Sequence, residues 1–161
     1  MPTSVHILNG PNLNLLGTRE PLIYGRDTLK DIETLCNKQA KRLGLSLTFK
    51  QTNNEGELVG FIQNAQKKAG GLIINAAAFS HTSIAVLDAL KGLDIPIIEV
   101  HLSNIFKREA FRHHSYVSEV ARGMICGLGS HGYVLALEAM AKLVEDSNTV
   151  KNSPKKGRKT S

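Results

Sequence analysis

The sequence predicts an α/β fold, a three-layer sandwich in which helices cover both faces of a five-stranded parallel sheet. Short apolar runs such as VHIL (5–8) and LIIN (72–75) alternate with segments whose apolar residues recur at helical spacing. The run LIIN is apolar on both sides, which is typical of a strand buried on both faces. Because a helix separates successive strands, we expect parallel pairing with right-handed crossovers. A length of 161 residues favours one domain.

In the first half of the chain, two strand–helix pairs precede a third strand. Thr28 and Asp31 have the spacing of a capping box at the start of the first helix, and Gly44 is a natural stop after it. The segment 45–50 alternates apolar and polar residues, which predicts a strand with one exposed face, as at a sheet edge. The expected elements are a strand at 5–9, a helix at 29–43, a strand at 45–50, a helix at 58–65 and a strand at 72–75.

In the second half, the pattern predicts a helix at 84–90, strands at 96–102 and 123–129, and a last helix at 134–143. Five such strands suit a flavodoxin-like three-layer sandwich. In open parallel sheets, ligands bind beyond the carboxyl ends of the strands, near the point where the strand order reverses. The segments that follow the strands are therefore where functional residues are expected.

The positive charge of the chain is concentrated near its C-terminal end. The formal net charge is +6, and residues 147–161 hold five basic residues and no acidic one. Taking these five from +6 leaves +1 for residues 1–146. We expect a single domain at 1–146, a basic disordered tail at 147–161, and no nucleic-acid partner beyond weak attraction of the tail to phosphates.

Targeting and redox features predict a cytoplasmic protein without membrane association. No charged-then-apolar leader opens the sequence, and no apolar run approaches the roughly 20 residues that a membrane span needs. Cys36 and Cys126 lie far apart and lack metal-ligand spacing, which predicts two reduced, buried thiols.

Polar residues suited to chemistry follow the first, third and fourth predicted strands. Glu99 and His101 alternate along one strand, so their side chains should share a face, where a carboxylate can fix the tautomer of an imidazole. Arg112 has the fork geometry that suits a carboxylate. The candidate site residues at this rim are Asn12, Arg19, Tyr24, Asn75, His81, Glu99, His101, Ser103, Arg108 and Arg112.

Each candidate also has a simpler interpretation. An asparagine after a strand often only caps a turn, and Arg19 and Tyr24 could be surface residues of a loop. Asp88 lies in the middle of a predicted helix, and its simpler interpretation is a charged residue on the solvent-exposed face of that helix. The histidines at 6, 113, 114 and 131 are interpreted as structural or surface residues.

Missing motifs narrow the chemistry. The sequence has no G-x-x-x-x-G-K-[ST], no G-x-G-x-x-G after the first strand, no G-x-S-x-G and no Cys/His cluster with zinc spacing. Apart from Lys107, lysine is absent from the segments that follow the first, third and fourth predicted strands, so a Schiff-base mechanism is poorly supported. The pattern favours acid–base chemistry without metal or organic cofactor on an anionic, hydroxyl-rich substrate.

Four long stretches and a closing one carry a resemblance to a known family. GPNLNLLGTREPLIYG, QTNNEGELV, INAAAFSHTSIA, EVHLSNIFKREAFRHHSY and GLGSHGY resemble the type II 3-dehydroquinate dehydratases, over roughly residues 5–144. The resemblance implies a cytoplasmic lyase of the shikimate pathway, which leads to chorismate and the aromatic amino acids. It implies conversion of 3-dehydroquinate to 3-dehydroshikimate by anti elimination through an enolate, without metal or cofactor. It also implies a dodecamer built from four trimers.

The resemblance also implies a role for each site residue. Tyr24 is implied as the general base, His101 as the general acid and Arg19 as the lid arginine beside the tyrosine. Asn12 would hold an ordered water near the enolate oxygen, and Glu99 would be the partner of His101. The other implied site residues are substrate contacts at Asn75, His81, Leu102, Ser103 and Arg112, an acid at Asp88 that reaches a neighbouring subunit's site, and a helper near the tyrosine at Arg108.

The resemblance leaves some points open. Leu22 and Ile23 lie in the lid where the family varies, position 102 is Leu where Ile is also common, and residues after about 146 fall outside the family pattern. Quinate breakdown uses the same reaction as aromatic biosynthesis. Two other classes remain as alternatives, a non-catalytic binding module of the same fold and a flavin or nucleotide binder. The flavin or nucleotide binder fits poorly with the bulky leucines that follow Pro11.

Overall fold

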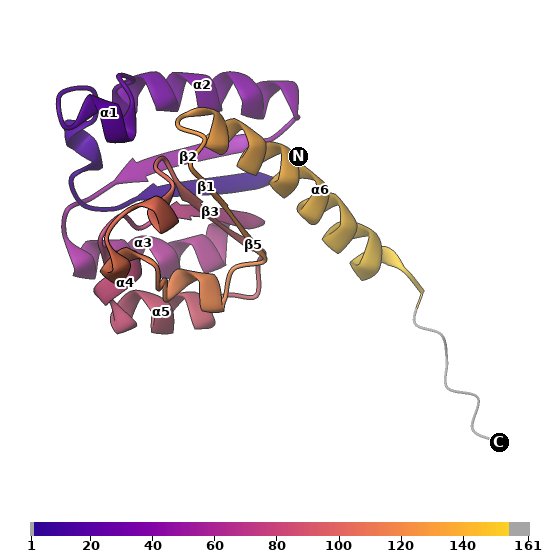
Figure 1. Ribbon diagram of the computed structural model, residues 1–161. Helices are drawn as coiled ribbons and strands as arrows, with labels where there is room; N and C mark the ends of the chain where they lie inside the picture. Colours follow the sequence, from indigo (N-terminus) through magenta and orange to yellow (C-terminus); the bar gives the residue numbers. More distant parts are fainter. Residues whose placement is uncertain (1, 155–161) are drawn as a thin grey trace.

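The computed structural model describes residues 2–154 and has the predicted α/β architecture (Figure 1). The main elements are β1 (Ser4–Asn9), α2 (Leu29–Arg42), β2 (Ser46–Gln51), α3 (Glu55–Lys68), β3 (Gly71–Asn75), α5 (Ile84–Lys91), β4 (Ile97–His101), β5 (Gly123–Cys126) and α6 (His131–Asn152). Short helical turns join them: η1 (Leu13–Leu15), α1 (Pro21–Tyr24), α4 (Phe79–Thr82), η2 (Ile105–Lys107), η3 (Ala110–Arg112) and η4 (Val117–Glu119).

The five strands form one parallel sheet in the order β2-β1-β3-β4-β5. The segment 45–50 was predicted to be an edge strand, and β2 is one. After β1 the chain continues to β2 on one side, and β3 then lies on the other side of β1, so the strand order reverses between β1 and β3. Asn9 and Asn75 are paired in register at the carboxyl ends of these two strands. This is the place where a sheet of this type binds ligands.

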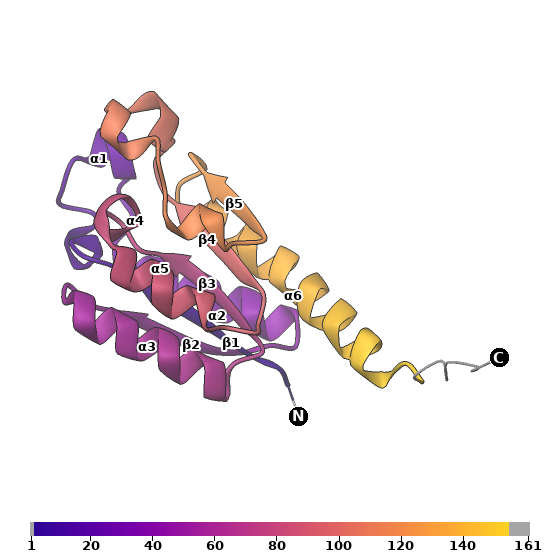
Figure 2. The same ribbon diagram turned by 90° about the horizontal axis from the view of Figure 1, so that it is seen from below.

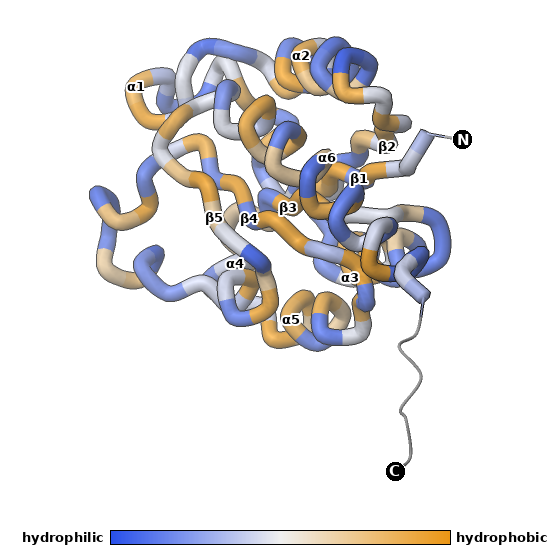
Figure 3. The backbone as a smooth tube through the Cα atoms, turned by 90° about the vertical axis from the view of Figure 1, so that its right-hand side faces the viewer, coloured by the Kyte–Doolittle hydropathy of each residue, from blue (hydrophilic) through white to orange (hydrophobic). Residues whose placement is uncertain are grey.

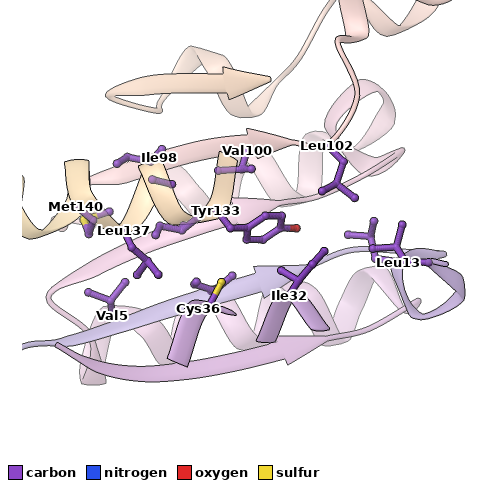
Figure 4. Close-up of a cluster of buried hydrophobic side chains, with 14 of the residues drawn as sticks. Val5, Leu13, Ile32, Cys36, Ile98, Val100, Leu102, Tyr133, Leu137 and Met140 are labelled. Atoms are coloured by element: carbon purple, nitrogen blue, oxygen red, sulfur yellow. The ribbon is translucent and has the colours of Figure 1, made fainter. Parts of the chain in front are cut away.

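Two hydrophobic layers enclose the sheet. Helices α2 and α6 cover one face, where Ile32, Cys36 and Leu137 pack against β1 and β4 (Figure 4). Helices α3 and α5 cover the other face, where Leu58 and Leu90 pack against β1, β3 and β4. Figure 3 shows the central strands as mainly hydrophobic, whereas the helices alternate between hydrophobic and hydrophilic residues. The sandwich thus holds the carboxyl ends of its strands rigidly.

The predicted start and stop of α2 are confirmed. The backbone N–H of Asp31 donates to Thr28 Oγ1 (3.1 Å), and the backbone N–H of Thr28 donates to Asp31 Oδ2 (2.9 Å), so both halves of the capping box form. Gly44 has φ +69°, a left-handed conformation that suits glycine after a helix.

The last helix differs from its prediction. It was expected at 134–143, but α6 runs from His131 to Asn152, so residues 147–152 are helical rather than part of a disordered tail. Val144 still packs on the core, and Lys142 and Asp146 form an i,i+4 ion pair (3.7 Å) that supports further turns. Figure 2 shows the end of α6 running past the sheet. Residues 155–161 of the predicted tail lie outside the described residues.

Strands β4 and β5 are shorter than the predicted 96–102 and 123–129, whereas β1, β2 and β3 agree with their predictions to within one residue at each end. Strand β5 ends at Cys126 because Gly127 and Gly129, with φ of +86° and +58°, turn the chain into α6. Both cysteines are free thiols; Cys36 is buried as predicted, whereas Cys126 is only half-buried. Burial, together with the nearby Glu33 carboxylate, raises the pKa of Cys36 to about 12. Within the part of the chain that the structure describes, no helix is long and apolar enough to cross a membrane.

Candidate active site

A pocket lies at the carboxyl ends of β1, β3 and β4, where the strand order reverses. We call it the switch-point pocket. It is lined by Pro11, Asn12, Leu13, Arg19, Tyr24, Asn75, Ala77, Ala78, His81, His101, Leu102, Ser103, Ile105, Arg108 and Arg112. The structure therefore brings together ten of the twelve residues that the sequence analysis singled out. Glu99 lies behind His101, and Asp88 is exposed on α5, away from the lining of this pocket.

The first wall of the pocket follows β1. Gly10 packs so closely against Ala76 that an added Cβ would stand 2.4 Å from the Ala76 carbonyl oxygen. Asn12 then adopts a left-handed conformation (φ 67°), which asparagine tolerates better than most residues. The backbone N–H of Asn12 donates to Asn53 Oδ1 (2.9 Å) and fixes this turn. The side chain of Asn12 is exposed to the pocket and remains available to a ligand or a water molecule.

Residues 17–25 form a segment that we call the lid, and it carries Arg19 and Tyr24. Glycines with positive φ, Gly17 (+91°) and Gly25 (+83°), stand at its two ends. Two cations lie close to the ring of Tyr24, because the guanidinium carbons of Arg19 and Arg108 are 5.4 Å and 5.1 Å from its centroid. Both are within the range at which a guanidinium interacts with an aromatic ring.

The wall that follows β3 rests on a buried hydrogen-bond chain. Tyr133 of α6 is fully buried, and its hydroxyl donates to Asn9 Oδ1 (2.7 Å) and accepts from Asn75 Nδ2 (2.9 Å). Asn75 Oδ1 in turn accepts from the backbone N–H of Ala77 (3.2 Å), a residue held at φ 51°. Because Asn75 is anchored through both side-chain heteroatoms, it presents its remaining N–H in a fixed direction.

His81 of α4 has a defined tautomer. Its Nδ1 lies 2.8 Å from the backbone carbonyl oxygen of His114, which can only accept, so Nδ1 carries the hydrogen. Burial, together with the positive charges of His101 and Arg112, lowers the pKa of His81 even though the hydrogen bond to His114 opposes this. The ring is therefore neutral at pH 7, and Nε2 is a hydrogen-bond acceptor at the pocket.

Glu99 and His101 share one face of β4, as their alternation predicted. Their side chains are 2.5 Å apart, from Nε2 of His101 to Oε2 of Glu99, and both are buried. Burial on its own raises the pKa of Glu99, but hydrogen bonds and the charge of His101 outweigh it and hold that pKa below its usual range. Glu99 is therefore an ionised carboxylate, and it leaves Nδ1 of His101 as the ring nitrogen available to a substrate.

The segment after β4 supplies the positive end of the pocket. Arg108 Nη1 donates weakly to Ser103 Oγ (3.4 Å). Arg112 is half-buried, and its Nε donates to Glu109 Oε2 (2.8 Å). This bond orients the guanidinium and leaves its terminal nitrogens for an anionic group. Among residues 2–154, no three His, Cys, Asp or Glu side chains stand close enough together to hold a metal ion.

Comparison with known proteins decides which family this geometry belongs to. The model of a family described as dehydroquinase class II matches residues 3–141. The chain belongs to this family. All twelve residues singled out in the sequence lie within the matched range. Class II dehydroquinases are 3-dehydroquinate dehydratases, lyases that catalyse a dehydration in the shikimate pathway.

Individual relatives agree with the family model over nearly their whole length. The 3-dehydroquinate dehydratase of Azorhizobium caulinodans is 56% identical over 141 residues, which cover 88% of this chain and 95% of the relative. The enzyme of Brucella canis is 54% identical over 146 residues, with 91% and 93% covered. The crystal structures of type II dehydroquinases from Propionibacterium acnes and Butyrivibrio crossotus both superpose with a TM-score of 0.85. Their identities are 46% and 38%, and they cover 88% and 86% of this chain and 98% and 97% of their own.

Some pocket residues of this class II dehydroquinase had no signal in the sequence. Pro11, Leu13, Ala77, Ala78 and Ile105 line the pocket through apolar or small side chains, which carry no chemical signature. A lining role for them depends on the shape of the backbone. His6 is buried, as expected of a structural residue, and the rings of His113, His114 and His131 lie at exposed positions.

Proposed function

We propose that the switch-point pocket dehydrates 3-dehydroquinate to 3-dehydroshikimate by anti elimination through an enolate. The single observation that carries this proposal is that a candidate base and a candidate acid line or adjoin the same pocket. A tyrosine close to two guanidinium groups is suited to be a base, and a histidine on a buried carboxylate is suited to be an acid. Elimination of water from a β-hydroxy ketone needs one of each.

In the first step, the phenolate of Tyr24 takes the proton alpha to the ketone. The electrons of that C–H bond form the carbon–carbon double bond of the enolate, and the negative charge moves to the former ketone oxygen. Arg19 and Arg108 favour the phenolate form. Closure of the lid over the substrate would exclude water and strengthen this interaction.

The negative charge that develops on the enolate oxygen needs a hydrogen-bond donor beside it. The exposed side chain of Asn12 is suited to hold a water molecule against the enolate oxygen. In the second step, the enolate returns its electrons, the carbon–oxygen bond of the leaving hydroxyl breaks, and His101 donates the proton that turns the hydroxide into water. The new double bond is conjugated with the ketone.

The remaining pocket residues would bind and orient the substrate. Arg112 is suited to the carboxylate, because its free terminal nitrogens can bind it in a bidentate manner. His81 Nε2 would accept from a substrate hydroxyl, and the remaining N–H of Asn75 would donate to one. Leu102 and Ser103 would supply backbone contacts. Positioning of this kind can lower a barrier by several kcal/mol.

The assembly and setting of the enzyme are part of the same proposal. We propose a dodecamer of four trimers, in which the exposed Asp88 reaches the site of a neighbouring subunit. We also propose that the enzyme acts in the cytoplasm, in aromatic biosynthesis. Light scattering of the purified protein tests the assembly, and a monomer that retains full turnover would refute the role of Asp88.

The decisive experiment is a direct assay with 3-dehydroquinate, which follows the ultraviolet absorbance of the conjugated enone product in the presence of EDTA. The wild type should turn over, and Tyr24→Phe should lose nearly all activity without unfolding. Tyr116→Phe is the matched control, because Tyr116 lies outside the pocket lining, and it should keep full activity. Arg19→Ala should lower kcat by orders of magnitude. Substantial turnover in Tyr24→Phe would overturn the assignment of the base.

A further inference from the structure

The carboxylate of Glu99 receives hydrogen bonds from two hydroxyl groups as well as from His101. Ser115 Oγ donates to Oε2 at 2.6 Å, on the oxygen that also accepts from His101. Ser118 Oγ makes a short hydrogen bond to the other oxygen, Oε1. Glu99 is fully buried, so these donors take the place of water around its charge.

Neither serine lines the switch-point pocket. Both belong to the segment 115–119, which is held by contacts of residues that do not themselves line the pocket. The backbone N–H of Tyr116 donates to the carbonyl oxygen of Ser80 (2.8 Å), and the side chain of Val117 is fully buried in the core between the sheet and α5. The two hydroxyls are therefore placed by the fold, before any substrate arrives.

A buried carboxylate that lacks donors tends to take up a proton. A protonated Glu99 would donate its own proton to Nε2 of His101 and hold the imidazole as a neutral ring, whose Nδ1–H is a far weaker acid toward a leaving hydroxyl than that of an imidazolium. Donors on both oxygens oppose this protonation, and they also fix the plane of the carboxylate. Because Nε2 of His101 is bound to that carboxylate, a fixed plane sets the direction of the imidazole.

The other groups around this pair do not replace the serines. The ring of His81 stacks on His101, with centroids 6.2 Å apart, and it is neutral at pH 7. Arg112 lines the same pocket as His81, and its positive charge helps to lower the pKa of His81. On the side of β5, Met124 Sδ faces Ser118 Oγ at 3.8 Å and carries no charge.

We propose that Ser115 and Ser118 are positioning residues of the dehydration, which hold Glu99 ionised and oriented so that His101 is a correctly aimed proton donor. This inference rests on the proposed function, because it assigns the serines to the proton-donating half of that reaction.

The test is the same assay with 3-dehydroquinate on Ser115→Ala, Ser118→Ala and the double variant. Each single variant should lower kcat by roughly 10-fold, the usual effect of removing one hydrogen bond to a charged group. KM should stay within about 2-fold, because neither serine touches the pocket. Ser118→Thr keeps a hydroxyl at this exposed position, so this variant should retain most of the wild-type kcat.

Ser130→Ala is the matched control, since Ser130 Oγ donates to Asp27 Oδ2 (2.6 Å) at an exposed position, away from the pocket lining. It removes the same kind of hydrogen bond and should leave kcat unchanged. Folding and assembly of each variant are checked by urea unfolding and light scattering. If Ser115→Ala does not fold, Ser118→Ala and Ser118→Thr decide the matter alone.

A double-mutant cycle separates positioning from a merely structural role. In a Glu99→Gln background there is no carboxylate charge to hold, so Ser118→Ala should cost less than about 3-fold there, against roughly 10-fold in the parent. Equal losses in the two backgrounds, or a change confined to KM, would overturn the inference. Failure of the wild type to turn over would refute the proposed function, whereas an active wild type with unaffected serine variants refutes this inference alone.

Discussion

Tyr133→Phe should destabilise the protein by about 1–4 kcal/mol, although it removes a single oxygen atom. That oxygen is the centre of a buried chain, in which it donates to Asn9 Oδ1 and accepts from Asn75 Nδ2. Phenylalanine keeps the ring and its packing against β1 and β4. The expected loss therefore comes from hydrogen bonding and not from a cavity.

The magnitude follows from the two amides that are left behind. Asn9 is fully buried and Asn75 is 3% exposed, so water cannot replace the lost partner at either site. A buried polar group without a partner costs about 1–3 kcal/mol, which gives roughly 2–6 kcal/mol for the pair. Loss of the hydroxyl returns about 1–2 kcal/mol, because it no longer has to be dehydrated on folding.

Urea unfolding at matched protein concentration measures this change. With a slope of about 2 kcal/mol per M, the midpoint should fall by about 0.5–2 M. The control is Tyr116→Phe, because Tyr116 is half-buried and its hydroxyl makes no hydrogen bond among residues 2–154. This variant should change stability by less than about 0.5 kcal/mol. KM should also rise in Tyr133→Phe, since Asn75 loses its anchor. A difference between the two variants below about 0.5 kcal/mol would refute this reasoning.

Three further predictions concern single positions. Gly10→Ala should lower the free energy of unfolding by at least about 2–3 kcal/mol, because its Cβ would meet the Ala76 backbone at 2.4 Å; a loss below 1 kcal/mol in urea unfolding would contradict the close approach. Ser80→Ala should leave stability unchanged or raise it by up to about 1 kcal/mol, because among the described residues the buried Ser80 Oγ has no partner to lose; thermal unfolding that shows a clear loss would contradict this. Burial and the charges of two nearby lysines lower the pKa of His6, so the unfolded chain binds a proton there more readily and stability should fall as pH drops below about 6.5; His6→Val should flatten that fall between pH 7 and 5, and parallel stability curves would contradict it.

The main elements could be predicted because burial leaves a local record in the sequence. A strand covered on both faces appears in the sequence as an unbroken apolar run, as in β3. A capping box such as Thr28 and Asp31 marks the start of a helix. The end of α6 has no such pattern in the sequence. Residues 147–152 are polar apart from the exposed Val150, and they continue a helix whose earlier turns are held by packing. The short turns α1 and α4 are likewise too brief to show a period.

The residues of the candidate site could be predicted where their chemistry is carried by the side chain and their position by a strand end. Glu99 and His101 are two residues apart, so their alternation along β4 was enough to pair them. The groups that support the site are a different case. Tyr133 bonds to Asn9 across 124 positions of the sequence, and Ser118 bonds to Glu99 across 19. Contacts of this kind arise only once the topology has brought the segments together.

The course of α6 has a practical consequence for handling the enzyme. Its last turns, at Asn148, Thr149 and Asn152, line the same surface pocket as Thr3, the residue before β1. The switch-point pocket lies at the opposite, carboxyl ends of the strands. A fluorescent label or a resin linkage placed near Asn152 would therefore stand a full strand length from the entrance used by substrate. Immobilised protein attached there should show the same KM as protein in solution, whereas attachment through the lid would not.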